Sequence, residues 1–192
     1  MKLSRFILGT SVLLLSQCSK CKQDNPVPSD PVSRLPPPTQ TGAGTFGCLL
    51  NGQPWIPSGG GALSTPNFYV TYDPTYKGGN LAVTAYRVLG STTNRQYLGV
   101  GGDGINQAGT YQLVTFELNP TTPLRVASFS DGSKASPCNE YLNNPGTKAA
   151  GKLVLTRLDN RQGIVSGTFE FTLAQPGCDT IKITNGRFDY KF

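Results

Sequence analysis

Apolar and polar residues alternate along the last part of the chain. Residues 165–173 read VSGTFEFTL, so that every second position from Val165 is apolar or glycine. A period of two places one row of side chains on a buried face and the other in water, as in a half-buried β-strand. The alternation resumes over 181–184 after the turn residues Gln175-Pro176-Gly177, and again over 187–192. This pattern predicts that the chain ends in antiparallel strands tied into a sheet.

Shorter runs of the same kind fill the chain upstream and are separated by turn residues. They cover 44–50, 53–57, 68–72, 81–88, 97–100, 110–114, 124–130 and 151–158. Many short runs with frequent turn signals, and no convincing helix after residue 17, are typical of an all-β domain. We therefore predict a single antiparallel β-sandwich or barrel-like domain of about nine or ten strands.

Two pairings follow from the turns and from the chain end. Asn51-Gly52 tolerates the positive φ of a type I′ turn, so it predicts a hairpin between its flanking strands. A free terminal strand bearing three aromatic side chains would invite edge-to-edge aggregation. We therefore expect the last strand, 187–192, to pair with the first strand, near 45–50.

The N-terminus has the features of a secretory signal. Lys2 and Arg5 precede an apolar run that ends at Leu15, and this run is shorter than the about 20 residues of a membrane span. The junction Leu15-Ser16-Gln17-Cys18 resembles a bacterial lipobox, in which the Cys becomes the acylated first residue of the mature protein. We predict a signal peptide over 1–17 and lipidation of Cys18. An ordinary secretory signal with a free Cys18 is the alternative.

Residues 18–40 are predicted to be the lipidated Cys and a proline-rich disordered linker, because they carry six prolines and little apolar content. In extended polyproline conformation, at about 3.1 Å per residue, such a linker reaches roughly 70 Å. The acidic residues that resemble a surface-export signal are missing after Cys18. We therefore expect a membrane anchor in the cell envelope, at the periplasmic face of the outer membrane, with the folded domain over 41–192.

Composition excludes several classes of function. The chain has a formal charge of +6, but from Thr41 onward it carries 12 basic and 9 acidic residues without a basic cluster, which speaks against nucleic-acid binding. The absence of histidine excludes the Ser-His-Asp and Cys-His nucleophile pairs. The glycine-rich residues 99–104 lead into a strand rather than a helix, so we interpret them as a turn and not a phosphate loop. We expect no cofactor and no metal, with calcium near Asp103 and Asn106 as a weak alternative.

Four cysteines remain after Cys18 in an oxidising compartment, where disulfides form. We predict the pair Cys138–Cys178, since each residue lies in a loop just before a late strand. Closing a loop of about 41 residues would stabilise the fold by roughly 4 kcal/mol in the chain-entropy model. Cys48 lies in the alternating row of the first strand and reads as a small buried hydrophobe. A zinc site of four thiols is the alternative, but the spacing lacks a paired knuckle motif.

A family resemblance rests on three motifs. They are Phe46-x-Cys48-x-x-Asn51-Gly52-x-x-Trp55, Gly167-Thr168-Phe169-x-Phe171 and Ile183-Thr184-x-Gly186-Arg187-Phe188-Asp189. In these the chain resembles a family of small Bacteroidota lipoproteins. The resemblance implies an envelope location and an all-β domain, and it brings no catalytic residue.

The leading functional hypothesis is a non-enzymatic, membrane-tethered binding or structural module whose partner is a glycan or an envelope protein. Trp55 is either a stacking platform for sugars or a cover for the end of the core, and Glu140 and Tyr141 lie together in an irregular loop. These three residues are the candidate ligand-binding residues. The alternatives are a carboxylate-dependent hydrolase acting on envelope polysaccharide and a lipocalin-like carrier of a small ligand.

Overall fold

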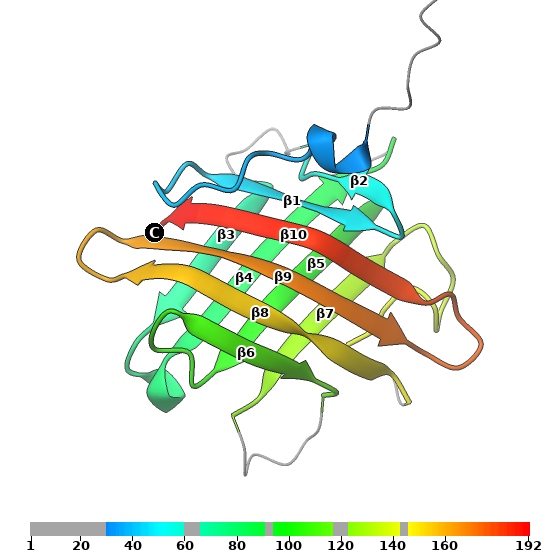
Figure 1. Cartoon of the computed structure of the whole chain (residues 1–192). Helices are drawn as coiled ribbons and strands as arrows, with labels where there is room; N and C mark the ends of the chain where they lie inside the picture. Colours follow the sequence, from blue (N-terminus) through cyan, green and yellow to red (C-terminus); the bar gives the residue numbers. More distant parts are fainter. Residues whose placement is uncertain (1–29, 60–65, 91–93, 117–122, 143–145) are drawn as a thin grey trace, which may run out of the picture.

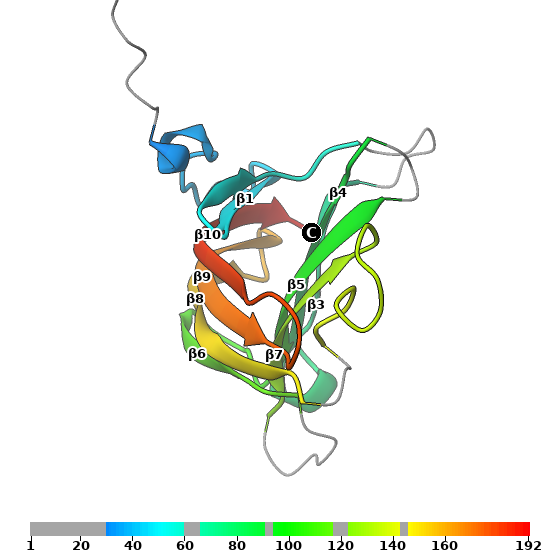
Figure 2. The ribbon, with the colours of Figure 1, turned by 90° about the vertical axis from the view of Figure 1, so that its right-hand side faces the viewer.

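Two antiparallel sheets packed face to face make up the domain, which is therefore a β-sandwich as predicted (Figures 1 and 2). The computed structural model describes residues 30–59, 66–90, 94–116, 123–142 and 146–192. The larger sheet has six strands in the order β2-β1-β10-β9-β8-β6, and the smaller has four in the order β3-β4-β5-β7. The strands are β1 (Thr45–Leu50), β2 (Gln53–Trp55), β3 (Phe68–Asp73), β4 (Asn80–Val88), β5 (Arg95–Asp103), β6 (Gly109–Val114), β7 (Arg125–Asp131), β8 (Lys148–Asp159), β9 (Ile164–Ala174) and β10 (Ile181–Lys191).

Both predicted pairings are present. β1 lies antiparallel to β10, with Thr45 opposite Asp189 and Leu50 opposite Ile183. β1 and β2 form a hairpin whose turn residues Asn51 and Gly52 both have positive φ. The C-terminal strand thus lies inside the six-stranded sheet, between β1 and β9, with Phe188 buried, Tyr190 partly buried and Phe192 exposed just beyond the strand.

The two apolar runs at the chain end belong to one strand with a bulge. Inward-facing residues of β10 change from odd to even numbers, because the pairing of β10 with β9 shifts between Ile183 and Gly186. Asn185 has a φ of 53° at this point, a left-handed conformation that asparagine tolerates better than most residues. The break in alternation that separates 181–184 from 187–192 in the sequence is therefore this bulge.

Aromatic rings fill the space between the two sheets. The ring of Phe46 lies 5.9 Å from Trp55, 5.2 Å from Phe68 and 5.3 Å from Phe169, centroid to centroid. These contacts join both sheets in one core, to which residues of all ten described strands contribute. A core filled in this way differs from the open interior that a lipocalin-like carrier needs.

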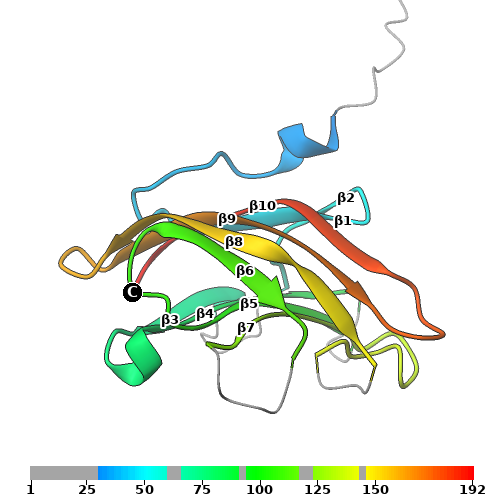
Figure 3. The ribbon, with the colours of Figure 1, turned by 60° about the horizontal axis from the view of Figure 1, so that its bottom comes forward.

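Residues 30–43 form an N-terminal strap on the outer face of the six-stranded sheet, the side turned away from the smaller sheet (Figure 3). The strap begins with a short 3₁₀ turn, Pro31–Arg34, followed by the buried Leu35. Its backbone is held by arginines of the sheet: Arg187 Nη1 donates to the carbonyl of Pro36 at 3.2 Å, and Arg157 Nη1 donates to that of Gln40 at 2.6 Å.

The buried carboxylate of Asp189 on β10 is the main attachment of the strap. It is 1% exposed and accepts hydrogen bonds from Thr39 Oγ1 and from the backbone N–H groups of Thr41, Gly42 and Ala43, at 2.7 to 3.0 Å. The linker predicted to run to residue 40 therefore packs on the sheet from residue 30 onward. Composition alone does not reveal this, because the attachment comes from long-range hydrogen bonds rather than from apolar content.

Within the part of the chain that the structure describes, no helix has the length and apolar character needed to cross a bilayer.

Candidate functional site

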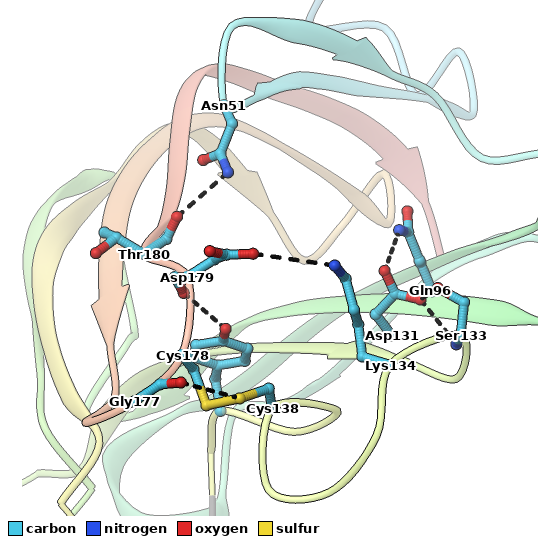
Figure 4. A network of polar contacts seen from close by, with 11 residues as sticks. Asn51, Gln96, Asp131, Ser133, Lys134, Cys138, Gly177, Cys178, Asp179 and Thr180 are labelled. Carbon is cyan, nitrogen blue, oxygen red and sulfur yellow. Dashed lines mark hydrogen bonds and ion pairs between the residues drawn. A yellow bond between two sulfur atoms is a disulfide. The ribbon is translucent and has the colours of Figure 1, made fainter.

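A cavity of about 470 Å³ opens at one end of the sandwich. Its walls come from the β1–β2 turn, the start of β5, the end of β7 with the loop that follows, and the loop between β9 and β10 (Figure 4). Apolar side chains of Leu50, Phe129, Tyr141 and Ile181 line it together with a small number of polar groups. Ligand sites in proteins have this size and this mixture of many apolar and few polar groups.

The predicted disulfide, Cys138–Cys178, is present and forms part of the cavity wall. It joins a loop of each sheet: the loop that follows β7 of the four-stranded sheet and the loop between β9 and β10 of the six-stranded sheet. The two Cα atoms are 5.4 Å apart. The disulfide therefore fixes the distance between two of the loops that line the cavity.

Asp131, the last residue of β7, is the buried charge of the cavity, with only 7% of its surface exposed. Its Oδ2 accepts a hydrogen bond from Gln96 Nε2 at 2.7 Å, and its Oδ1 accepts two from Ser133, from N at 2.9 Å and from Oγ at 2.6 Å. Burial alone raises the pKa of Asp131, but the hydrogen bonds from Ser133 and Gln96 outweigh it, and the pKa lies below its ordinary value. The carboxylate is therefore ionised at neutral pH.

Gln96 links Asp131 to the interior of the sandwich. Its Oε1 accepts hydrogen bonds from Trp55 Nε1 at 2.9 Å and from Arg87 Nε at 2.8 Å. The guanidinium of Arg87 also lies over the Trp55 ring, 5.4 Å from its centroid. Both the oxygen and the nitrogen of the Gln96 amide form hydrogen bonds, so Gln96 is held in place and fixes the position of the Asp131 carboxylate from the interior side.

An ion pair spans the mouth of the cavity. Lys134 Nζ lies 3.9 Å from Asp179 Oδ2, and the two side chains are 55% and 85% exposed (Figure 4). An exposed pair at this distance contributes about 0–1 kcal/mol, so it opens at little cost. The Asp179 backbone is held more firmly, since its carbonyl accepts a hydrogen bond from the Tyr141 hydroxyl at 2.7 Å.

Of the three predicted ligand-binding residues, Trp55, Tyr141 and Glu140, only Tyr141 lines the cavity. Trp55 is 0% exposed, so its interpretation as a sugar-stacking platform is wrong and its role is in the core. Tyr141 lines the cavity with its ring buried. Glu140 is exposed and bridges Ser130 through its backbone, outside the cavity lining. Cys18, the predicted lipidation site, lies outside the described residues.

Three residues of this site were missed at the sequence level: Arg87, Gln96 and Asp131. A signal was present, because each falls at the end of an inward-facing row of its strand, where the alternation calls for an apolar residue. Polar residues at such positions must find buried partners, and these three are joined to each other.

The other groups considered in the sequence are Asp103 as a calcium ligand, the cysteines as zinc ligands and the thiol of Cys48. Asp103 accepts hydrogen bonds from Lys77 Nζ at 3.1 Å and Asn80 Nδ2 at 2.7 Å, so its oxygens serve protein donors. No group of three or more His, Cys, Asp or Glu side chains suited to a metal occurs among the described residues. Cys48 is buried as predicted, and burial raises its pKa to about 12, which leaves it an unreactive thiol.

Comparison of the chain with protein-family models, with curated proteins and with solved structures finds no match. The class of protein is therefore defined by its own fold and site, a ten-stranded β-sandwich in the described residues with a disulfide-bridged cavity at one end.

Proposed function

We propose that this protein is a lipid-anchored module of the bacterial envelope that binds a small organic ligand, without catalysis, in the cavity at the end of the sandwich. The observation that carries the proposal is the cavity itself. It is large enough for a small molecule, its apolar floor is met by a buried carboxylate, and a disulfide holds two of its walls together.

Binding is favoured over hydrolysis by the state of the cavity carboxylates. A glycoside hydrolase needs one carboxyl group that stays protonated to act as general acid. The pKa of Asp131 is lowered instead, and both of its oxygens already accept hydrogen bonds. The other carboxylate, Asp179, is exposed and paired with Lys134. This pair of groups suits recognition of a ligand better than proton transfer.

The binding proposal is tested by filling the cavity. We expect Ala135→Trp to block small compounds that bind the unmodified protein, since Ala135 lines the cavity. The measurement is ligand-observed NMR with a library of small organic compounds. Ala82→Trp, on the outer face of the smaller sheet, is the control that adds the same side chain elsewhere. If no compound distinguishes Ala135→Trp from Ala82→Trp, the cavity is not a binding site.

The anchoring proposal is tested separately. We expect radiolabelled palmitate to enter the protein in cells and to be lost in Cys18→Ala, because the lipobox Cys is the acceptor of the acyl chains. Separation of outer-membrane and soluble fractions should move the variant to the soluble fraction. Equal labelling of both proteins would refute the anchor and would leave the binding proposal standing.

A further inference from the structure

The charged side chains that line the end cavity have a negative excess. Among the described residues they are the buried Asp131 and, at the exposed mouth, the ion pair of Lys134 and Asp179. Two carboxylates against one ammonium leave a formal charge of −1 within a cavity of about 470 Å³. A cavity of this charge attracts a cation and repels an anion of the same shape.

The buried carboxylate still has room for a further hydrogen-bond donor. A carboxylate offers about four lone-pair sites, and the hydrogen bonds from Gln96 and Ser133 occupy three of them on Asp131. All three donors are neutral groups, so within the described residues no cation is hydrogen-bonded to this buried negative charge. One further donor completes the set, and a charged donor such as an ammonium forms the stronger, charge-assisted hydrogen bond with a carboxylate.

Lys134 already places an ammonium in the cavity, beside Asp179, but holds it weakly. Its backbone N–H is fixed by a hydrogen bond of 3.1 Å to the carbonyl of Asp131, so the side chain starts at the cavity wall. From there it extends toward Asp179, where the separation of 3.9 Å and the exposure of both side chains make the contact weak (Figure 4). The lysine can therefore move out of the cavity without breaking a strong interaction.

We propose that the cavity binds small amphipathic amines, whose ammonium group displaces that of Lys134 from Asp179 and donates to the free lone pair of Asp131 while the apolar body packs on the floor of the cavity. The floor is formed by Leu50, Phe129 and Ile181, side chains suited to an aromatic or alkyl group. The inference deepens the proposed function and rests on it, since it names the ligand class for the same cavity.

The experiment uses three probes of nearly one shape and different charge. Benzylamine is positive at neutral pH, benzyl alcohol is neutral and benzoate is negative. We expect benzylamine to bind the full-length protein at least about tenfold more tightly than benzyl alcohol, and benzoate to bind most weakly, by titration followed with NMR up to about 10 mM. Asp179→Asn should weaken benzylamine several-fold and leave benzyl alcohol unchanged.

Lys134→Met is the most direct test, because it removes the lysine ammonium that competes with the ligand ammonium for the cavity carboxylates. We expect benzylamine to bind this variant several-fold more tightly than the unmodified protein. Lys152→Met is the matched control, since Lys152 forms an exposed ion pair with Glu170 on β8 and β9, outside the cavity lining. Equal affinity for benzylamine in both lysine variants overturns the replacement of Lys134.

The remaining outcomes separate this inference from the proposed function. Tighter binding of benzoate or benzyl alcohol than of benzylamine refutes the amine class, and so does no binding of any of the three probes. In each case the cavity still stands as a binding site if other compounds distinguish Ala135→Trp from Ala82→Trp. If they do not, both proposals fail together.

Discussion

A single carboxylate, Asp189, decides whether the N-terminal strap stays on the sheet. It lies in the polar row of β10, which alternation alone predicts to face water, yet it is buried beneath the strap. Besides the donors of the strap, Ser166 Oγ of β9 donates to its Oδ1 at 2.6 Å. Burial alone raises the pKa of Asp189, but these hydrogen bonds, with Ser166 and Thr39 the strongest contributors, hold it well below its ordinary value.

Asp189→Asn should therefore destabilise the domain by about 3 kcal/mol, because an amide NH₂ would face backbone N–H donors and leave them unsatisfied. Urea unfolding monitored by circular dichroism measures the loss. The control is Glu170→Gln, which changes an exposed carboxylate and should cost no more than about 0.5 kcal/mol. A difference of less than about 1 kcal/mol between the two variants would contradict the assigned role.

The same residue predicts an acid dependence with a definite sign. Since the pKa of Asp189 is lower in the folded than in the unfolded protein, its contribution is complete above the unfolded pKa and is lost as the pH falls toward the folded value. We expect the unfolding free energy of the unmodified protein to fall below about pH 4, and that of Asp189→Asn to fall less steeply. Parallel curves for the two proteins from pH 6 to pH 2 would exclude this linkage.

Cys48 gives a second prediction at the scale of one residue. With a pKa raised to about 12 by burial, its thiol should resist iodoacetamide at pH 8 in the folded protein and react after unfolding in urea. Peptide mapping by mass spectrometry distinguishes this thiol from Cys18 and Cys21. Rapid modification of Cys48 under native conditions would mean that β1 opens far more readily than its place between β2 and β10 implies.

Single residues also show how far the sequence predicts this structure. The row of Val165, Phe169 and Leu173 is buried as its alternation indicates, because period two depends only on local geometry. Asp189 and Gln96 could not be placed in the same way. Their environments depend on partners from other strands or from the strap, which a local pattern does not identify.

At the scale of elements, the sequence predicts strands and turns better than it predicts the loops between them. The Asn51-Gly52 hairpin and most strand runs appear where their patterns place them, but the interpretation of 99–104 as a turn is wrong, because residues 99–103 continue β5 and pair with β4. The cavity could not be predicted, since it forms where a turn, two loops and two strand ends meet, and those ends come together only through the order of strands in the sheets. The predicted disulfide was the one feature of the sequence that indicated that two of these loops lie close together.

Removing that disulfide tests its contribution to the fold. The double variant Cys138→Ala, Cys178→Ala should lower the unfolding free energy by roughly 4 kcal/mol, because the unfolded chain regains the freedom of a loop of about 41 residues. Thermal and urea unfolding measure the loss, and the unmodified protein in a reducing agent should match the variant. We also expect amide exchange to rise selectively in 132–142 and 175–180, the loops that the disulfide joins. Unchanged stability would show that the two loops are held by their other contacts.

For the whole molecule, the strap defines where the folded domain begins. Residues 30–43 belong to it by their contacts, although their composition resembles that of the linker before them. The strap lies on the outer face of the six-stranded sheet (Figure 3), whereas the residues that line the cavity come from turns, loops and strand ends at one end of the sandwich. The strap and the proposed binding site therefore occupy different surfaces, so the proposed lipid anchor would leave the cavity accessible.

Two truncations test this boundary. A chain starting at residue 30 should unfold with the same free energy as the full-length protein, because it retains every contact of the strap with Asp189, Arg157 and Arg187. A chain starting at residue 44 should lose at least about 3 kcal/mol, since Asp189 then loses its strap donors and the covered part of the sheet becomes exposed. Asp189→Asn should cost less in the shorter chain, because the strap donors are already absent there and only the hydrogen bond from Ser166 remains, which an amide oxygen can also accept. Full additivity of the substitution and the truncation would show that the strap and Asp189 stabilise the domain independently. An unchanged unfolding free energy in the chain starting at residue 44 would place the start of the domain at β1 instead.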